Sequence, residues 1–134
     1  RLFETEHGNS AHDEINIIVK GKNYGWPTIT GDQTRNGMEP PFAQSGEETW
    51  APAGAIFLNG KLFFGGLRGE TLFGLKVNNG NAIISKYFMQ EFGRIRAVTL
   101  GPDGFIYIST SNRDGRGNPQ NNDDKILKID PSQL

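Results

Sequence analysis

Hydrophobic and polar positions alternate in short runs along this chain, and no long stretch follows the 3.6-residue period of a helix. No window of about 11 residues has apolar positions at i, i+3, i+4 and i+7 without an intervening Gly or Pro. We therefore expect no helix longer than about two turns. Runs rich in Ile, Leu, Val, Phe and Tyr, bounded by turn residues, instead predict strands. These runs are Arg1–Glu6, Glu14–Val19, Ala53–Leu58, Lys61–Gly65, Thr71–Val77, Ala82–Phe88, Arg94–Leu100, Phe105–Thr110 and Lys125–Ile129.

Short turns connect several of these predicted strands. Asn59-Gly60 lies between two apolar runs and predicts a tight hairpin, because both residues tolerate a positive φ. Asn78-Asn79-Gly80-Asn81 predicts a second hairpin, and Pro102-Asp103-Gly104 predicts a further turn between two strands. Neighbouring strands are therefore expected to pair antiparallel.

A weak repeat appears when pairs of predicted strands are aligned. Apolar strands begin near Leu2, Leu62 and Ile106, and each is followed by a Gly- or Asn-containing loop and a second strand. A spacing of about 40–50 residues is typical of four-stranded propeller blades, and an inserted loop from Asn23 to Trp50 lengthens the first interval. We predict an all-β chain in which residues 1–134 form about two to two and a half antiparallel blades of one propeller domain. The missing blades are expected upstream.

Composition excludes several classes of protein. The 134 residues contain 14 Lys+Arg and 15 Asp+Glu, a net charge of −1, which argues against a nucleic-acid partner. No run approaches the roughly 20 apolar residues of a spanning helix, so no membrane span is expected. The chain has no Cys, which excludes disulfides and thiol chemistry. It begins with Arg1 and shows no signal-peptide pattern, so we interpret it as part of a longer protein.

The densest polar segment, Glu4 to Glu14, holds both histidines of the chain and four carboxylates. His7 and His12 are compatible with a zinc site that has Asp13 or Glu14 as a third ligand. Paired carboxylates are compatible with glycoside hydrolysis. Loop carbonyls with one carboxylate are compatible with calcium. A solvated loop between blade strands is the remaining alternative.

Several motifs follow one another along nearly the whole chain. They are Glu6-His7-Gly8, Asp13-Glu14-Ile15-Asn16, Asn23-Tyr24-Gly25-Trp26-Pro27, Ala51-Pro52-Ala53-Gly54, Phe64-Gly65-Gly66-Leu67-Arg68-Gly69, Gly93-Arg94-Ile95-Arg96 and Gly101-Pro102-Asp103-Gly104. In this order they resemble the soluble pyrroloquinoline-quinone (PQQ)-dependent sugar dehydrogenases, which are the glucose/sorbosone dehydrogenase family with its aldose sugar dehydrogenases. The resemblance implies a six-bladed β-propeller, of which this chain matches the C-terminal portion.

The resemblance also implies two calcium sites. Backbone carbonyls matching Gly8 and Asn9 bind the calcium that holds the quinone, and Asn9 stands where the family usually has Pro. Glu14 and Tyr24 match a second, structural calcium site, through a carboxylate and a backbone carbonyl. Hard cations prefer such oxygens. The alternatives are that Glu14 pairs with a nearby Lys and that Tyr24 only packs.

Arg94 and Arg96 are two residues apart in a predicted strand, so their side chains are expected on one face. Two guanidiniums on one face repel unless an anion lies between them, and the resemblance implies that the polycarboxylate PQQ supplies it. Arg68 matches a family Lys that also contacts the cofactor. A solvent-facing pair on an outer strand is the alternative. We expect the arginines and the Gly8–Asn9 turn to converge on one face.

Two further segments have weaker signals. Trp26 is compatible with sugar stacking, but the resemblance implies that its motif is a structural corner between blades, which we favour. Residues 112–124 are rich in Asn, Asp and Gly and could bind an ion. They lack a regular alternation of ligands, so we interpret them as a flexible surface loop.

The function implied by the resemblance is a PQQ- and calcium-dependent oxidation of an aldose at its anomeric carbon to a lactone. The implied partners are a sugar and the upstream blades, a homodimer is compatible with the family, and the implied location is periplasmic or extracellular. The family's His base has no counterpart here, so no catalytic residue is assigned and the chain alone is expected to be inactive. A non-catalytic propeller binding module and a calcium-dependent propeller lactonase are the alternatives.

Overall fold

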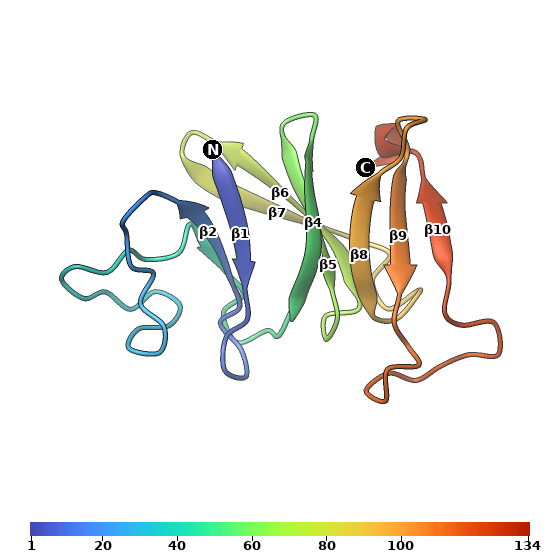
Figure 1. Ribbon diagram of the computed structural model, residues 1–134, viewed down its shortest axis with the longest axis horizontal. Helices are drawn as coiled ribbons and strands as arrows, with labels where there is room; N and C mark the ends of the chain where they lie inside the picture. Colours follow the sequence, from blue (N-terminus) through green and yellow to red (C-terminus); the bar gives the residue numbers. More distant parts are fainter. The chain divides into compact units, whose positions relative to one another are not determined.

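Antiparallel sheet dominates the chain, which a computed structural model describes over residues 1–134 (Figure 1). Ten strands form one four-stranded and two three-stranded sheets, and the only helix is a single 3-10 turn, η1 (Pro131–Gln133). No helix has the length and apolar character needed to cross a membrane. The chain divides into two compact units, Arg1–Ala51 and Pro52–Leu134.

The first unit contains one small sheet, with the strand order β1-β2-β3. Its strands are β1 (Leu2–Glu6), β2 (Glu14–Ile18) and β3 (Ala43–Gln44). Phe3 lies opposite Ile17, and Glu6 lies opposite Glu14. Ile15 of β2 is completely buried, and its neighbours Glu14 and Asn16 are buried as well. The sequence did not predict β3, because two residues are too few to show a strand period.

The second unit begins with a four-stranded meander in the order β4-β5-β6-β7. Its strands are β4 (Pro52–Leu58), β5 (Lys61–Gly66), β6 (Thr71–Asn78) and β7 (Asn81–Tyr87). The β4–β5 turn has φ values of 50° at Asn59 and 78° at Gly60, and the β6–β7 turn has 49° at Asn79 and 82° at Gly80. Both central residues of each turn are therefore left-handed, as the Asn-Gly pairs predict for tight hairpins.

The last sheet has the order β8-β9-β10. Its strands are β8 (Ile95–Leu100), β9 (Ile106–Thr110) and β10 (Ile126–Ile129), and all neighbours pair antiparallel. A bulge between Ile95 and Ala97 shifts the register at the start of β8. The long loop from 111 to 125 leaves the sheet between β9 and β10 (Figure 1).

The two sheets of the second unit share one apolar core. Phe63 and Leu72 of the meander pack with Ile95, Ile106 and other residues of the last sheet. Glycine brings the backbones close, because a Cβ at Gly65 would lie 2.6 Å from the Ile95 carbonyl oxygen. A larger residue there would push the sheets apart.

All nine predicted strands are present, with ends within about two residues of the predicted ones. The prediction of an all-β chain built from antiparallel blades of a β-propeller is confirmed. The aligned pairs of the repeat correspond to β1–β2, β5–β6 and β9–β10. Of the predicted site residues, Gly8 and Asn9 lie in the loop after β1 and Arg68 lies in the loop after β5, whereas Arg94 and Arg96 lie at the start of β8.

Candidate functional site

Arg94 and Arg96 meet at a single carboxylate oxygen. Their Nη2 atoms lie 2.8 and 3.0 Å from Asp114 Oδ2, and Arg94 Nε donates to the same oxygen over 3.1 Å. Arg94 is only 6% exposed, whereas the Arg96 side chain is 50% exposed. The repulsion expected between the two guanidiniums is therefore offset by an aspartate of the chain itself.

The start of β8 explains why the two arginines differ in burial. β8 begins at Ile95, so Arg94 precedes the strand, and the bulge between Ile95 and Ala97 displaces Arg96. Simple alternation along a regular strand, from which a shared face was predicted, does not describe this segment. The two head groups nevertheless come together, because Asp114 accepts from both.

Asn112 fixes the backbone next to Arg94. Its buried Oδ1 accepts from Arg94 N over 2.8 Å, and its Nδ2 donates to the Phe92 carbonyl over 2.9 Å. Asn112 N donates in turn to Asp124 Oδ1 over 2.5 Å. The interpretation of residues 112–124 as a flexible surface loop misses these contacts, which tie the loop to the segment that precedes β8.

The arginine site keeps an excess of positive charge. Hydrogen bonds from Arg94 in the first place, and from the Arg116 N–H and Arg96, lower the pKa of Asp114 to about 2, so this carboxylate is ionised at neutral pH. Two guanidiniums face one carboxylate, which leaves one positive charge uncompensated. Arg96 Nη1 makes no hydrogen bond in the chain. The site can therefore accept a further anionic group.

Arg68 is exposed and lies in the loop between β5 and β6. The carbonyl of its neighbour Leu67 accepts a hydrogen bond from Arg94 Nη1 over 3.1 Å. The backbone next to Arg68 thus lies beside the Arg94 guanidinium. The structure brings all three predicted cofactor-binding residues into one region of the second unit.

Asp13 organises the turn that contains Gly8 and Asn9. Its buried Oδ1 accepts from Gly8 N over 3.0 Å, and its Oδ2 accepts from Trp50 N over 2.6 Å and from Ala51 N over 2.9 Å. One carboxylate therefore satisfies three backbone donors. Because the Asp13 carboxylate already accepts from backbone amides, the backbone carbonyls of the turn are the oxygens available to a cation.

Gly8 is required by the turn itself. A Cβ at this position would lie 1.8 Å from the Ala11 carbonyl oxygen and 2.8 Å from that of His12. Glycine at this position therefore accommodates the close approach of the turn's own carbonyl groups. Asn9 is exposed, and its side chain makes no hydrogen bond in the chain.

Glu14 and Tyr24, predicted for a second metal, have partners within the first unit. Gly31 N donates to Glu14 Oε1 over 2.8 Å, so the carboxylate binds a backbone amide and not a lysine. Burial raises the pKa of Glu14 above its usual value. The Tyr24 hydroxyl donates to the Ile17 carbonyl over 2.8 Å and accepts from Val19 N over 2.7 Å. The Tyr24 side chain therefore stabilises the end of β2. Calcium binding by the Tyr24 carbonyl stays a prediction.

A second group of carboxylates lies on the β1–β2 sheet. Asn16 Nδ2 donates to Glu4 Oε2 and to Glu6 Oε2, each over 3.1 Å. Burial, together with the nearby charges of Glu4 and Glu14, raises the pKa of Glu6. A general acid in glycoside hydrolysis also needs a raised pKa, so Glu6 and Glu4 are the carboxylates on which that alternative would depend.

The zinc alternative lacks its ligand set. The structure contains no group of three or more His, Asp or Glu side chains arranged to hold a metal ion. His12 Nδ1 instead lies 3.4 Å from Gln44 Oε1, and its Nε2 lies 3.7 Å from Glu47 Oε1. The predicted convergence of the Gly8 turn with the arginines stays a prediction, since these residues belong to different units.

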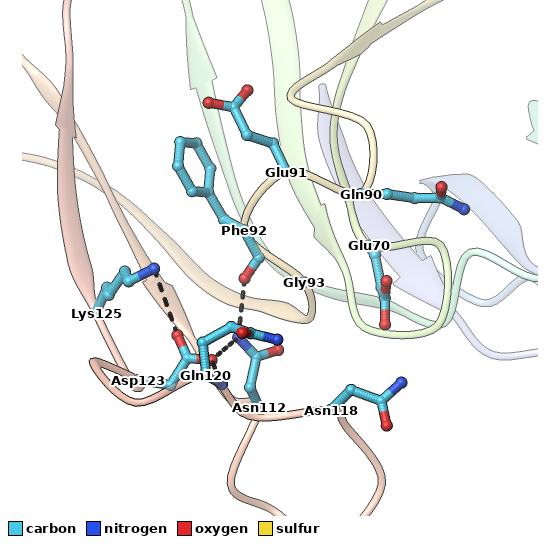
Figure 2. A pocket seen from close by; sticks show the side chains of 10 residues that line it. All are labelled: Glu70, Gln90, Glu91, Phe92, Gly93, Asn112, Asn118, Gln120, Asp123 and Lys125. Atoms are coloured by element: carbon cyan, nitrogen blue, oxygen red, sulfur yellow. Dashed lines mark hydrogen bonds and ion pairs between the residues drawn. The ribbon is translucent and has the colours of Figure 1, made fainter.

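Two hollows lie at the loops, one in each unit. The hollow in the first unit has a volume of about 510 Å³ and is lined by residues 9–12 with Trp26, Pro27 and Thr30. The hollow in the second unit has a volume of about 270 Å³. Figure 2 shows this second hollow, in which Asp123 pairs with Asn112 and lies 3.7 Å from the Lys125 Nζ. Carboxylates and amides dominate its lining, so it is a strongly polar site.

The fold and the site together define an all-β chain of antiparallel blades with an arginine pair that shares one aspartate oxygen. The sequence profile of the glucose/sorbosone dehydrogenase family matches residues 1–127. The chain therefore belongs to the glucose/sorbosone dehydrogenase family, and the predicted resemblance is confirmed.

Individual relatives agree with this assignment. The aldose sugar dehydrogenase YliI of Escherichia coli is 33% identical over 97% of this chain and 38% of its own length. An uncharacterised protein of Synechocystis is 31% identical over 87% of this chain and 33% of its own length. The solved PQQ-bound aldose sugar dehydrogenase of Streptomyces coelicolor has a TM-score of 0.86 and 36% identity, over 94% of this chain and 38% of that one. The chain spans about a third of the length of the curated relatives that it matches.

Sequence reasoning did not assign the two aspartates, one in each unit, that organise the Gly8 turn and the arginine pair. Asp13 appeared only as an alternative zinc ligand, and Asp114 only as part of a polar loop. Their partners are distant in sequence, with Trp50 37 residues from Asp13 and Arg94 20 residues from Asp114. Two arginines close together in the sequence, Arg94 and Arg96, were the signal that could have predicted an aspartate of the chain between them.

Proposed function

We propose that this chain forms the C-terminal blades, about two to two and a half of six, of a PQQ- and calcium-dependent aldose dehydrogenase. The enzyme oxidises a sugar at its anomeric carbon to a lactone, and the remaining blades lie upstream. A periplasmic or extracellular location belongs to the same proposal. Family membership and the PQQ-bound state of the Streptomyces coelicolor relative support it.

The observation that carries the proposal is the arginine pair. Arg94 and Arg96 share one oxygen of Asp114, so the site keeps one positive charge and a free Arg96 Nη1. A carboxylate of the quinone can take a charge-assisted hydrogen bond there. Arg94 is held by Asp114 and by the Leu67 carbonyl, so its role is to fix the positive field. Arg68 adds a further exposed cation beside this backbone.

The turn in the first unit fits a hard cation by the chemistry of its donors. Asp13 fixes the Gly8 amide, and the carbonyls of Gly8 and Asn9 are oxygens of the kind that calcium prefers. Glu14 offers a carboxylate for the second, structural calcium, together with the Tyr24 carbonyl. The raised pKa of the Glu14 carboxyl is consistent with a site that a cation would stabilise in its ionised form.

When bound, the quinone supplies the two-electron acceptor that oxidation of an aldose to a lactone requires. The part of this chain is binding and orientation. Its arginines hold an anionic group, and its turn carbonyls hold a cation. Removal of the hydroxyl proton needs a base. The family's histidine base has no counterpart in this chain. We assign that step to the blades upstream.

The test is dye reduction by the full-length protein that contains this chain, with aldose, PQQ and calcium. Arg96→Gln is expected to raise the PQQ concentration for half-maximal activity about tenfold or more, since it removes a charged donor worth roughly 1.5–3 kcal/mol. Arg35→Gln, an exposed arginine of the first unit, is the control and should leave this concentration unchanged. An unchanged PQQ requirement in Arg96→Gln would contradict the assigned role.

Two outcomes support the alternatives. A folded full-length protein that neither binds PQQ nor reduces dye would be a propeller binding module. Calcium-dependent hydrolysis of a lactone without PQQ would identify a lactonase. The isolated chain is expected to be inactive under every condition, because general-base help alone contributes roughly 10²–10⁴-fold.

A further inference from the structure

The corner after β2 leaves a tryptophan in solvent beside a hollow. Trp26 is 54% exposed, whereas Trp50, the other tryptophan, is 4% exposed. The Trp26 side chain makes no hydrogen bond and no ring contact within the chain. Trp26 lines the hollow of about 510 Å³ together with Pro27, Thr30 and residues 9–12. This volume is within the usual range of small-molecule sites, roughly 300–1,000 Å³.

The turn that presents Trp26 is rigid. The Gly25 carbonyl accepts from Thr28 N over 2.6 Å and from Ile29 N over 3.1 Å. Ile29 is buried directly beneath Gly25, where a Cβ would lie 2.1 Å from its Cγ1. Trp26 and Pro27 therefore form the outer side of a corner whose inner side is packed. A structural corner and an exposed binding platform are compatible, because they use opposite sides of the same turn.

The lining of the hollow selects the class of ligand. It contains no Asp, Glu, Lys or Arg, and its only ionisable side chain is His12. A neutral ligand is therefore favoured over an anion or a cation. The hydroxyls of Ser10 and Thr30, the amide of Asn9 and the His12 imidazole supply both donors and acceptors. One flat apolar face beside such mixed polar groups matches a sugar ring, which has C–H groups on its face and hydroxyls on its edge.

We infer that this hollow is a carbohydrate-binding subsite, in which a neutral sugar ring stacks on Trp26 and its hydroxyls bond to Asn9 and His12. Asn9 also belongs to the turn proposed to hold calcium, so the bound sugar lies next to that turn. As a substrate subsite the inference rests on the proposed dehydrogenase function, whereas sugar binding can be measured without it.

The first experiment measures binding to the full-length protein with no PQQ or calcium present. Glucose and maltotriose are titrated separately while tryptophan emission and acrylamide quenching are followed. A stacked sugar removes water from Trp26, so emission shifts to shorter wavelength and quenching falls. The same titration of Trp26→Phe identifies the part of either change that comes from Trp26. Comparison of the two sugars distinguishes a site for one ring from a site for an extended sugar chain.

The second experiment compares variants by calorimetry. Trp26→Ala is expected to weaken sugar binding about tenfold or more, and Trp26→Phe, which keeps a flat ring, should retain most of the affinity. Phe57→Ala is the matched control, because Phe57 is an equally exposed aromatic, at 59%, in the other unit. Unchanged affinity in Trp26→Ala, or Trp26 emission that saturating sugar does not alter, overturns the subsite.

Dye-reduction kinetics separate this inference from the proposed function. If both hold, Trp26→Ala raises KM for the sugar that binds and leaves kcat unchanged, as expected for lost uniform binding. A protein that binds sugar through Trp26 but never reduces dye keeps the subsite and contradicts the dehydrogenase. An active enzyme in which Trp26→Ala alters KM for no sugar keeps the dehydrogenase and contradicts the subsite.

Discussion

Two loops at equivalent places in the repeat use an aspartate carboxylate in opposite ways. In the loop after β1, Asp13 accepts only from backbone, at Gly8, Trp50 and Ala51. In the loop after β9, Asp114 accepts from two guanidiniums, from the Ser111 hydroxyl and from one backbone N–H. The first carboxylate is neutralised by dipoles, whereas the second lies between full positive charges.

This difference determines what each loop can bind. Where the carboxylate accepts hydrogen bonds only from backbone N–H groups, the backbone carbonyl oxygens of the loop remain available, and these suit a hard cation. A loop in which one carboxylate lies between two guanidiniums has positive charge left over, and this suits an anion. The same position in two blades can therefore suit a cation in one blade and an anion in the other. Four changes of increasing subtlety test this comparison.

Removing Asp13 should have the largest effect. Asp13→Ala leaves three backbone N–H groups without their acceptor, and each such loss costs roughly 1–3 kcal/mol in a buried site. We expect the free energy of unfolding to fall by about 3 kcal/mol or more. Urea denaturation of the variant and of Asp32→Ala measures this. Asp32 is exposed and accepts one side-chain bond from Gln44, so its loss should be minor. Equal losses in the two variants would show that Asp13 is not the centre of its loop.

Gly8→Ala comes second. The added Cβ meets the Ala11 carbonyl, which is backbone and has no rotamer to escape into. Forced repacking of this kind costs roughly 1–3 kcal/mol. Calcium-dependent stabilisation should be lost together with the turn geometry, if the proposed site is correct. Gly60→Asn is the control, because Gly60 has open space around it and Asn tolerates its φ of 78°. A wild-type melting temperature and calcium response in Gly8→Ala would contradict the assigned role of this turn.

Asp114→Asn tests the second loop through pH. The folded pKa of Asp114 is about 2, below its ordinary value of 3.8. Its contribution to stability is therefore present above pH 4 and is lost as the pH falls through about 2. The variant should lack this acid-sensitive part between about pH 4 and 2. Urea unfolding from pH 2 to 7 measures the curve.

Asp103→Asn is the matched comparison for that curve. The Lys128 hydrogen bond lowers the pKa of Asp103 to about 2 as well, so both variants should flatten the acid limb. At pH 7 Asp114→Asn should be the less stable of the two variants, because it leaves the buried Arg94 guanidinium without a carboxylate partner. Lys128, by contrast, is half exposed to water. Equal stabilities at pH 7 would mean that Arg94 does not depend on Asp114.

The strands were predictable from sequence because their signals are local. Asn59-Gly60 and Asn79-Gly80 fix two hairpins through residues that are neighbours in the chain, and apolar alternation fixes the strands beside them. β3 was missed, because Ala43 and Gln44 become a strand only by pairing with β2. The bulge at Ile95 was missed for the same reason, since it depends on the register with β9.

The candidate site was predictable only in part. The roles of Gly8, Arg94 and Arg96 were predicted from a family resemblance. The expected repulsion between the two guanidiniums also predicted an anion near them, and the structure contains one. Asp114 was not identified as that anion, because it lies 20 residues from Arg94 in a loop with no periodic pattern. Asp13 was not recognised as a backbone acceptor, because its donors at Trp50 and Ala51 follow a long insertion. Local signals place elements, but they do not place contacts between distant loops.

Glu14→Gln should have the smallest effect on stability and a diagnostic response to calcium. Burial raises the folded pKa of Glu14 above its ordinary value of 4.5, so its contribution is most favourable below that pH and is lost as the pH rises through the folded pKa. A neutral Gln keeps the acceptor for Gly31 N and avoids this loss. Without calcium the variant should be slightly more stable than wild type at pH 7, because the Gly31 N–H offsets only part of the cost of burying the wild-type charge.

Added calcium should reverse that order. If Glu14 is a ligand of the structural calcium, the metal stabilises the wild type by mass action and has no carboxylate to bind in Glu14→Gln. Thermal unfolding with and without calcium measures both proteins, and Glu47→Gln, at a carboxylate whose side chain is 96% exposed, is the control. The control should respond like the wild type, because no role in metal binding is assigned to it. An equal gain from calcium in Glu14→Gln and in wild type would show that this loop binds calcium, if at all, through its carbonyls alone.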